Sequence, residues 1–115
     1  MASVADTAEQ MLTLFVEMAV RDRRCVITYK DMAAKLGRKG QQNLLQQPLD
    51  RARELCRERG LPEFPVMVIS QAALESGTLL PADGAIDKYG GVAEIRRLQA
   101  EVMQFDWSTL RPDVT

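Results

Sequence analysis

Apolar residues recur at helical spacing in four separate stretches of the chain, and this pattern limits the fold more than any other feature. We expect the first helix to begin after Ser3, whose hydroxyl can cap a helix start, and to run to about residue 21. Its inward positions are Ala8, Met11, Leu12, Phe15, Met18 and Ala19. The methionines among them are expected to fill the core.

The second and third helices are predicted from caps and glycines. Thr28, followed three residues later by Asp31, is a capping pair, and Gly37 is placed to end the second helix. The third helix is expected to start near Gln41 and to end at Gly60. Because proline cannot donate a backbone hydrogen bond, Pro48 predicts a kink or a break within it.

The rest of the chain adds little β structure. Residues 25–27 and 65–69 are apolar runs that predict short strands, and the turn signals in residues 71–89 predict a loop. A last helix is expected over about 92–104, with Phe105 and Trp107 folding back onto the core. Its inward positions are Val92, Ile95, Leu98 and Val102. The 115 residues therefore predict one mainly helical domain with a small β element.

Several residue types that catalysis needs are missing. The chain has no histidine, which excludes the commonest general base and the commonest metal ligand. Its two cysteines, Cys25 and Cys56, are too few for a four-cysteine zinc site and are expected to be buried free thiols. No phosphate-binding glycine motif is present. We expect no enzyme activity, no metal and no cofactor.

The termini and apolar runs bear on location. The first ten residues lack a basic cluster followed by a long apolar block, so we expect no secretory signal and a cytoplasmic protein. No apolar run is long enough for a membrane span, so we expect no membrane association.

Charge is unevenly distributed although the net charge is −1. Residues 21–60 contain eleven basic and five acidic residues, whereas the rest contains four basic and eleven acidic ones. A basic block of this size is typical of phosphate binding, and pairing with acids along a solvated helix is the alternative.

Within the basic block, two short helices joined by a glycine-containing turn predict a helix-turn-helix. Segment 27–37 contains the first helix and its stop, and 41–47 is the second helix. The outward residues of the second are amides, which can pair with base edges or phosphate oxygens. Lys30, Arg38 and Lys39 are the candidate phosphate contacts. The full set of candidate DNA-binding residues is Thr28, Tyr29, Lys30, Arg38, Lys39, Gln42, Asn43 and Gln46.

Residues 8–70 resemble the C-terminal domain of the alkylguanine DNA alkyltransferases and the small alkyltransferase-like proteins. The family pattern V-x-[ST]-Y-x-x-[LM]-A-x-x-x-G is matched by Val26, Thr28, Tyr29, Met32, Ala33 and Gly37. The resemblance extends to the segment Gly60-Leu61-Pro62 and the apolar run after it. It implies a winged-helix-like fold that binds duplex DNA, with Tyr29 at a phosphate.

The resemblance also implies that alkyl transfer is lost. The family's reactive P-C-H-R segment aligns with Pro65-Val66-Met67-Val68, which has no nucleophile. The arginine that the family inserts into the base stack aligns with Asn43, which is too short to fill the space of an extruded base.

Two functions remain open from the sequence. One is a non-catalytic DNA-binding module. The other is a phage or mobile-element protein that inhibits or adapts a host nucleic-acid machine, such as a defence system, through its acidic remainder and the 71–89 segment. A homodimer through the first or last helix is a further alternative.

Overall fold

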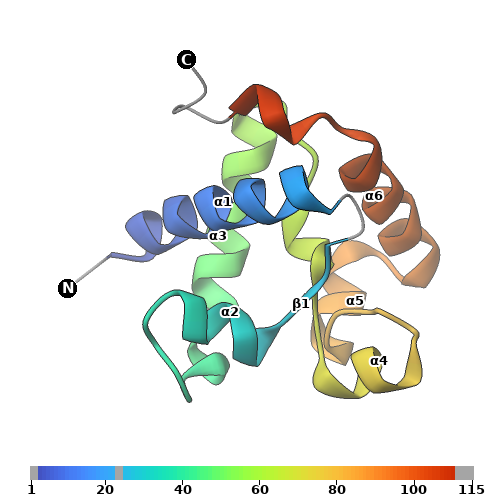
Figure 1. Ribbon diagram of the computed structural model, residues 1–115. Coiled ribbons are helices and arrows are strands. Elements are labelled where there is room, and N and C mark those ends of the chain that lie inside the picture. The colour runs from blue at the N-terminus through green and yellow to red at the C-terminus, as the bar shows by residue number, and fades with distance from the viewer. Residues whose placement is uncertain (1–2, 23–24, 111–115) are drawn as a thin grey trace.

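The computed structural model describes residues 3–22 and 25–110, which form a mainly helical fold with one very small sheet (Figure 1). The α-helices are α1 (Val4–Arg21), α2 (Tyr29–Lys35), α3 (Gln46–Glu58), α4 (Gln71–Ser76), α5 (Asp83–Tyr89) and α6 (Val92–Gln104). The 3-10 helices are η1 (Gln42–Leu44), η2 (Phe64–Met67) and η3 (Trp107–Leu110). The strands are β1 (Ile27–Thr28) and β2 (Val68–Ile69). None of the described helices combines the length and apolar character that crossing a bilayer requires.

The local signals for α1 and α2 are confirmed. The Ser3 hydroxyl accepts a hydrogen bond from the Asp6 N–H, and the Asp6 carboxylate returns one to the Ser3 N–H, a complete capping box. The Thr28 hydroxyl accepts from the Asp31 N–H at 3.1 Å and caps α2. Gly37, with φ of 77°, follows the end of α2 in a left-handed conformation that glycine adopts without steric cost.

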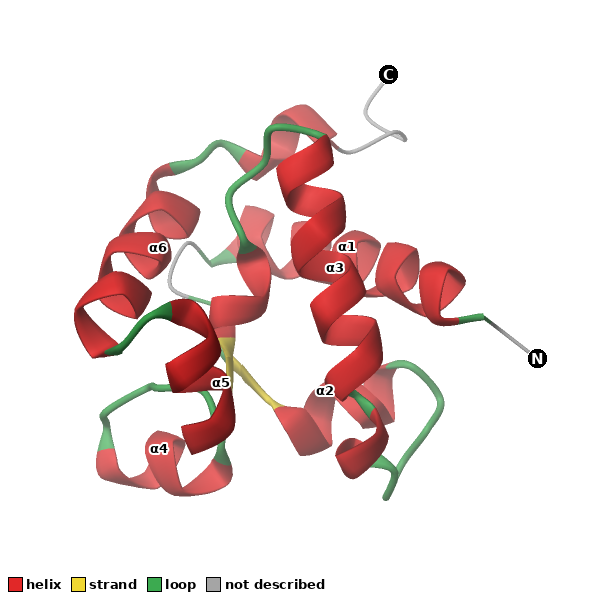
Figure 2. Ribbon diagram, turned by 180° about the vertical axis from the view of Figure 1, so that it is seen from behind, coloured by secondary structure: helices red, strands yellow, loops and turns green. Residues whose placement is uncertain are grey.

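Three aromatic rings form the centre of the core. Phe15 of α1 stacks on Phe64 of η2 with ring centroids 5.0 Å apart, and Trp107 meets the edge of Phe15 at 5.2 Å. Phe105 packs on Trp107 in turn, so both rings fold back onto the core as expected. Helix α1 lies across α3, which is in front in the view from behind (Figure 2). The core thus joins the first helix to the last described turn of the chain.

The two strands pair in parallel, with Ile27 opposite Val68 and Thr28 opposite Ile69. All four residues are buried. A parallel pair carries the chain out of both strands at the same end, so the starts of α2 and α4 lie side by side there. The antiparallel hairpin of a winged helix is not found among the described residues, and the expected wing is not confirmed.

The third helix begins later than expected. Residues 42–44 form a 3-10 turn, and the α-helix starts at Gln46, so the second helix expected over 41–47 is wrong as a continuous helix. Pro48 explains the difference, because its ring would clash with the carbonyl of residue 44 in a helix that started earlier. In the first turn of α3 its missing N–H is not needed.

Three further expectations are wrong. Residues 71–89 contain two helices instead of a loop, since the Ser70 hydroxyl caps α4 by accepting from the Ala73 N–H, and Gly77 and Gly90 end α4 and α5 with positive φ. The strand expected over 65–69 is reduced to two residues because 64–67 turn into a 3-10 helix with Pro65 in its first turn. Val92 is the first residue of α6 and is 46 % exposed rather than inward.

Candidate nucleic-acid interface

An open groove of about 400 Å³ lies at the end of the sheet where the strands give way to α2 and α4. In Figure 1 these two helices flank the lower end of the strands. The groove is lined by Thr28, Tyr29, Lys30, Gln42, Asn43, Gln46, Ser70, Gln71 and Ala82. Six of the eight candidate residues from the sequence are therefore brought to one surface.

The remaining two candidates, Arg38 and Lys39, do not line the groove. Arg38 is half-buried, and its Nη2 donates to the Thr7 hydroxyl of α1 at 2.9 Å. Lys39 is exposed in the turn between α2 and η1. Arg38 therefore fixes this turn to α1, while Lys39 remains at the surface of the turn.

Thr28 and Tyr29 are held in place by their neighbours. Thr28 is 3 % exposed and its hydroxyl caps α2, so it shapes the floor of the groove. The Tyr29 hydroxyl oxygen accepts a hydrogen bond from the Ala82 N–H at 3.0 Å. Burial raises the pKa of Tyr29 and the Ala82 N–H partly offsets this, so the phenol keeps its proton at neutral pH and can donate it.

Sequence reasoning missed Ser70, Gln71 and Ala82 on the groove lining. Ser70 had a local signal, because a serine three residues before Ala73 can cap a helix there. Gln71 and Ala82 had none, since they reach the groove only through the strand pairing and the Tyr29 hydrogen bond.

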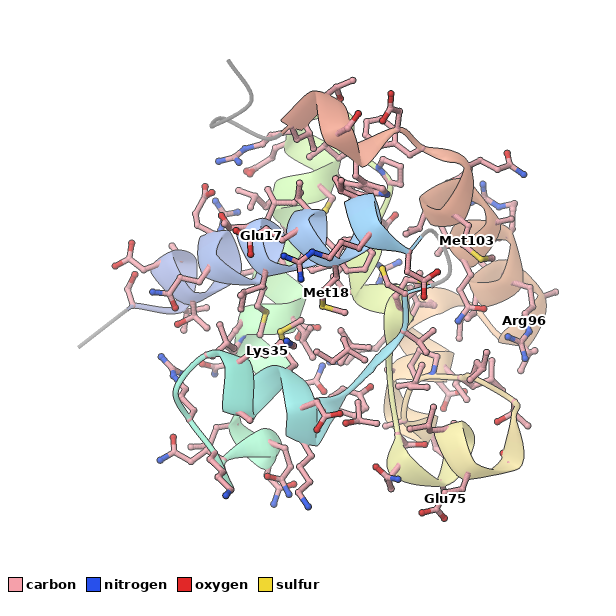
Figure 3. All side chains as sticks on the ribbon, in the orientation of Figure 1. Glu17, Met18, Lys35, Glu75, Arg96 and Met103 are labelled. Atoms are coloured by element: carbon pink, nitrogen blue, oxygen red, sulfur yellow. The ribbon has the colours of Figure 1, made fainter. Side chains whose placement is uncertain are left out.

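The basic block does not form one continuous surface. The arginines of α3 and the residue after it are paired with carboxylates: Arg51 with Glu54 and Glu58, Arg53 and Arg57 with Glu63, and Arg59 with Glu9. Lys35 lies on the opposite side of α2, below Glu17 and Met18 of α1 (Figure 3). Pairing along a solvated helix, the alternative expected from the sequence, therefore holds for Arg51, whereas Arg53, Arg57 and Arg59 pair with carboxylates outside α3.

Lys30 and Lys39 differ from those arginines. Both are exposed, and neither makes an ion pair within residues 3–22 and 25–110. Lys30 is the one cation on the described lining of the groove. Lys30 and Lys39 therefore leave positive charge available to a phosphate beside the groove and in the turn that follows α2.

The amides of the groove are not equivalent. Gln46 donates from Nε2 to Asp50 at 3.0 Å, and Gln71 donates from Nε2 to Glu75 at 3.3 Å. The Oε1 of Gln42 is buried without a hydrogen-bond partner. Two of the amides are therefore fixed by carboxylates one helical turn later, whereas the Gln42 carbonyl is unsatisfied.

The two thiols are not activated as nucleophiles. Burial raises the pKa of the Cys25 thiol to about 12 and that of Cys56 to about 11, so both stay protonated near neutral pH and are poor nucleophiles. Both are free and buried, as expected. No group of three metal-ligating side chains occurs in the part of the chain that the structure describes.

Comparisons with protein-family models, with curated proteins and with solved structures found no match for this chain. The function of the groove is therefore inferred from its geometry and its side chains.

Proposed function

We propose that the chain is a non-catalytic DNA-binding module of alkyltransferase-like type, which holds one strand of a duplex along the groove. The observation that carries this proposal is the assembly of six sequence-predicted residues on one open surface. In this proposal α2, η1 and the first turn of α3 play the part of the two helices in a winged-helix protein.

The chemistry of the groove supports a nucleic acid over an anionic small molecule. Lys30 and Lys39 supply cations for phosphates, and the Tyr29 hydroxyl supplies a neutral donor for a phosphate oxygen. The amides of Gln42, Asn43 and Gln46 offer donors and acceptors together, which is what base edges require.

The salt dependence of duplex binding tests the proposal. With Lys30 and Lys39 at phosphates, the slope of log K against log salt should be about −2. Lys30→Ala should weaken binding to all sequences and reduce the slope by about one. Lys35→Ala is the matched control, because it removes the same charge from the other side of the same helix (Figure 3) and should leave the slope unchanged. Absence of binding to any duplex at about 50 mM salt would overturn the proposal.

The protein-interaction alternative has lost part of its basis. The segment 71–89, which this alternative uses as a docking loop, contains the helices α4 and α5. Three of the acids that were to meet a basic partner, Glu63, Glu94 and Glu101, are paired with arginines of this chain. No described feature favours it over the groove, and capture of a host protein in place of duplex DNA is the outcome that would restore it.

A further inference from the structure

Gln42 lowers the stability of the folded state at its position. Its Oε1 is the one buried side-chain oxygen or nitrogen without a hydrogen-bond partner in the described parts of the chain. A buried carbonyl that has lost its water and gained no donor destabilises the folded state. An apolar side chain of similar length would avoid this cost, so folding does not account for glutamine here.

The same residue lines the groove, where a ligand can supply the missing donor. Gln46 and Gln71 are held by Asp50 and Glu75, which leaves their amides partly occupied. The Gln42 carbonyl has no such competitor, and rotation of its flexible side chain is enough to present the whole amide to a ligand in the groove.

The hydrogen-bonding side chains that line the groove of the protein favour one DNA base over the others. Guanine offers two acceptors in the major groove and is usually read by arginine, and no arginine is on the described lining. Adenine offers one donor, the N6 amino group, beside one acceptor, N7, and a glutamine amide matches both at once. The atom of Gln42 without a partner is the acceptor Oε1, and in this pair its donor is the N6 amino group of adenine.

We propose that Gln42 is the specificity-determining residue of the groove and that it reads adenine, with Oε1 accepting from the N6 amino group and Nε2 donating to N7. This inference rests on the proposed DNA-binding function. The Gln42 carbonyl has no hydrogen-bond partner in the free protein. Adenine can therefore donate to it without breaking a hydrogen bond within the protein.

The test uses the full chain and duplexes of about 20 base pairs composed only of adenine and thymine, with binding followed by fluorescence anisotropy at low salt. In one matched duplex N6-methyladenine replaces adenine, which blocks the free N6–H, and in another 7-deazaadenine removes the N7 acceptor. The wild-type protein should bind each modified duplex about tenfold more weakly than the unmodified one, the size of discrimination that a bidentate pair supplies.

Gln42→Met should bind the three duplexes equally, while its thermal stability equals or exceeds that of the wild type because the unsatisfied oxygen is gone. Gln47→Met is the matched control, since Gln47 is exposed and does not line the groove, and it should retain the discrimination. Equal wild-type binding to all three duplexes would overturn the role of Gln42 and leave the proposed function intact. Absence of binding to every duplex would instead overturn the proposed function.

Discussion

The Tyr29 hydroxyl oxygen accepts a hydrogen bond from the backbone N–H of Ala82 at 3.0 Å, although the two residues are 53 positions apart. Tyr29 begins α2, and Ala82 is the residue before α5. This one bond therefore ties the two sides of the groove together and orients the phenol of Tyr29.

Removing the Tyr29 hydroxyl should loosen the groove. Tyr29→Phe leaves the Ala82 N–H without its acceptor, and we expect the free energy of unfolding to fall by about 1 kcal/mol. Duplex binding should weaken as well, because a phosphate donor is lost. Urea denaturation and a binding titration measure the two effects, and wild-type values in both would show that the bond does not form in solution.

The Arg53–Glu63 pair should matter more than the other ion pairs of α3. Only 19 % of the Arg53 side chain and 15 % of the Glu63 side chain are exposed, and the Arg53 guanidinium lies 4.2 Å from the centre of the Tyr89 ring. Glu63→Gln leaves that guanidinium half-buried without its counter-charge, so we expect a loss of about 2 kcal/mol in urea denaturation. Glu54→Gln breaks an exposed pair with Arg51 and should change stability by less than about 0.5 kcal/mol. Equal effects of the two substitutions would contradict this ranking.

Trp107 should be essential for the core although it lies close to the end of the described chain. It is 3 % exposed, packs on Phe15 and Phe105, and donates from Nε1 to the Val102 carbonyl at 2.8 Å. Trp107→Ala should cost about 3 kcal/mol or more, measured by chemical denaturation. Leu74→Ala removes a side chain from a position that is 42 % exposed and should cost less than about 0.5 kcal/mol.

We expect the two buried thiols to lower the stability of the protein at alkaline pH. Burial raises the pKa of Cys25 to about 12 and that of Cys56 to about 11, from an ordinary value of 9.0. Above pH 9 the thiols ionise in the unfolded chain while they stay protonated in the folded one, so the unfolded state binds fewer protons. The free energy of unfolding should therefore fall as pH rises from about 9 toward 11, by at most about 1.4 kcal/mol per pH unit for each thiol.

Urea titrations across this pH range, with a reducing agent present, measure the slope. Half-buried Tyr29 and buried Tyr89 also have raised pKa values and add to the loss of stability near the upper end of this pH range. Cys25→Ala lowers stability at every pH but should make the pH dependence shallower. An unchanged slope in that variant would show that Cys25 is not buried as described.

Much of the secondary structure could be predicted because its signals are local. The Ser3 and Thr28 caps and the stop at Gly37 act within a few residues of the helix ends that they define. The start of α3 was misplaced because proline was expected to interrupt an existing helix, whereas Pro48 defines its first turn. Helix α4 was missed because Gly77 was interpreted as part of a turn inside a loop rather than as a helix end, and α5 was missed because Pro81 and Asp83-Gly84, at its start, were interpreted as turn signals.

By itself, the sequence determined that this chain is mainly helical and that its thiols are free and buried, and six of its eight candidate residues share a surface. Only the tertiary structure decided which charges remain available and what completes the groove. Arg53 pairs with Glu63 and Arg59 pairs with Glu9. The pairing of Ile27 with Val68 brings Ser70 and Gln71 to the groove that Tyr29 also lines. The physical reason is range: caps and apolar periodicity depend on neighbours in the chain, whereas strand pairing and ion pairing depend on which distant segments the core brings together.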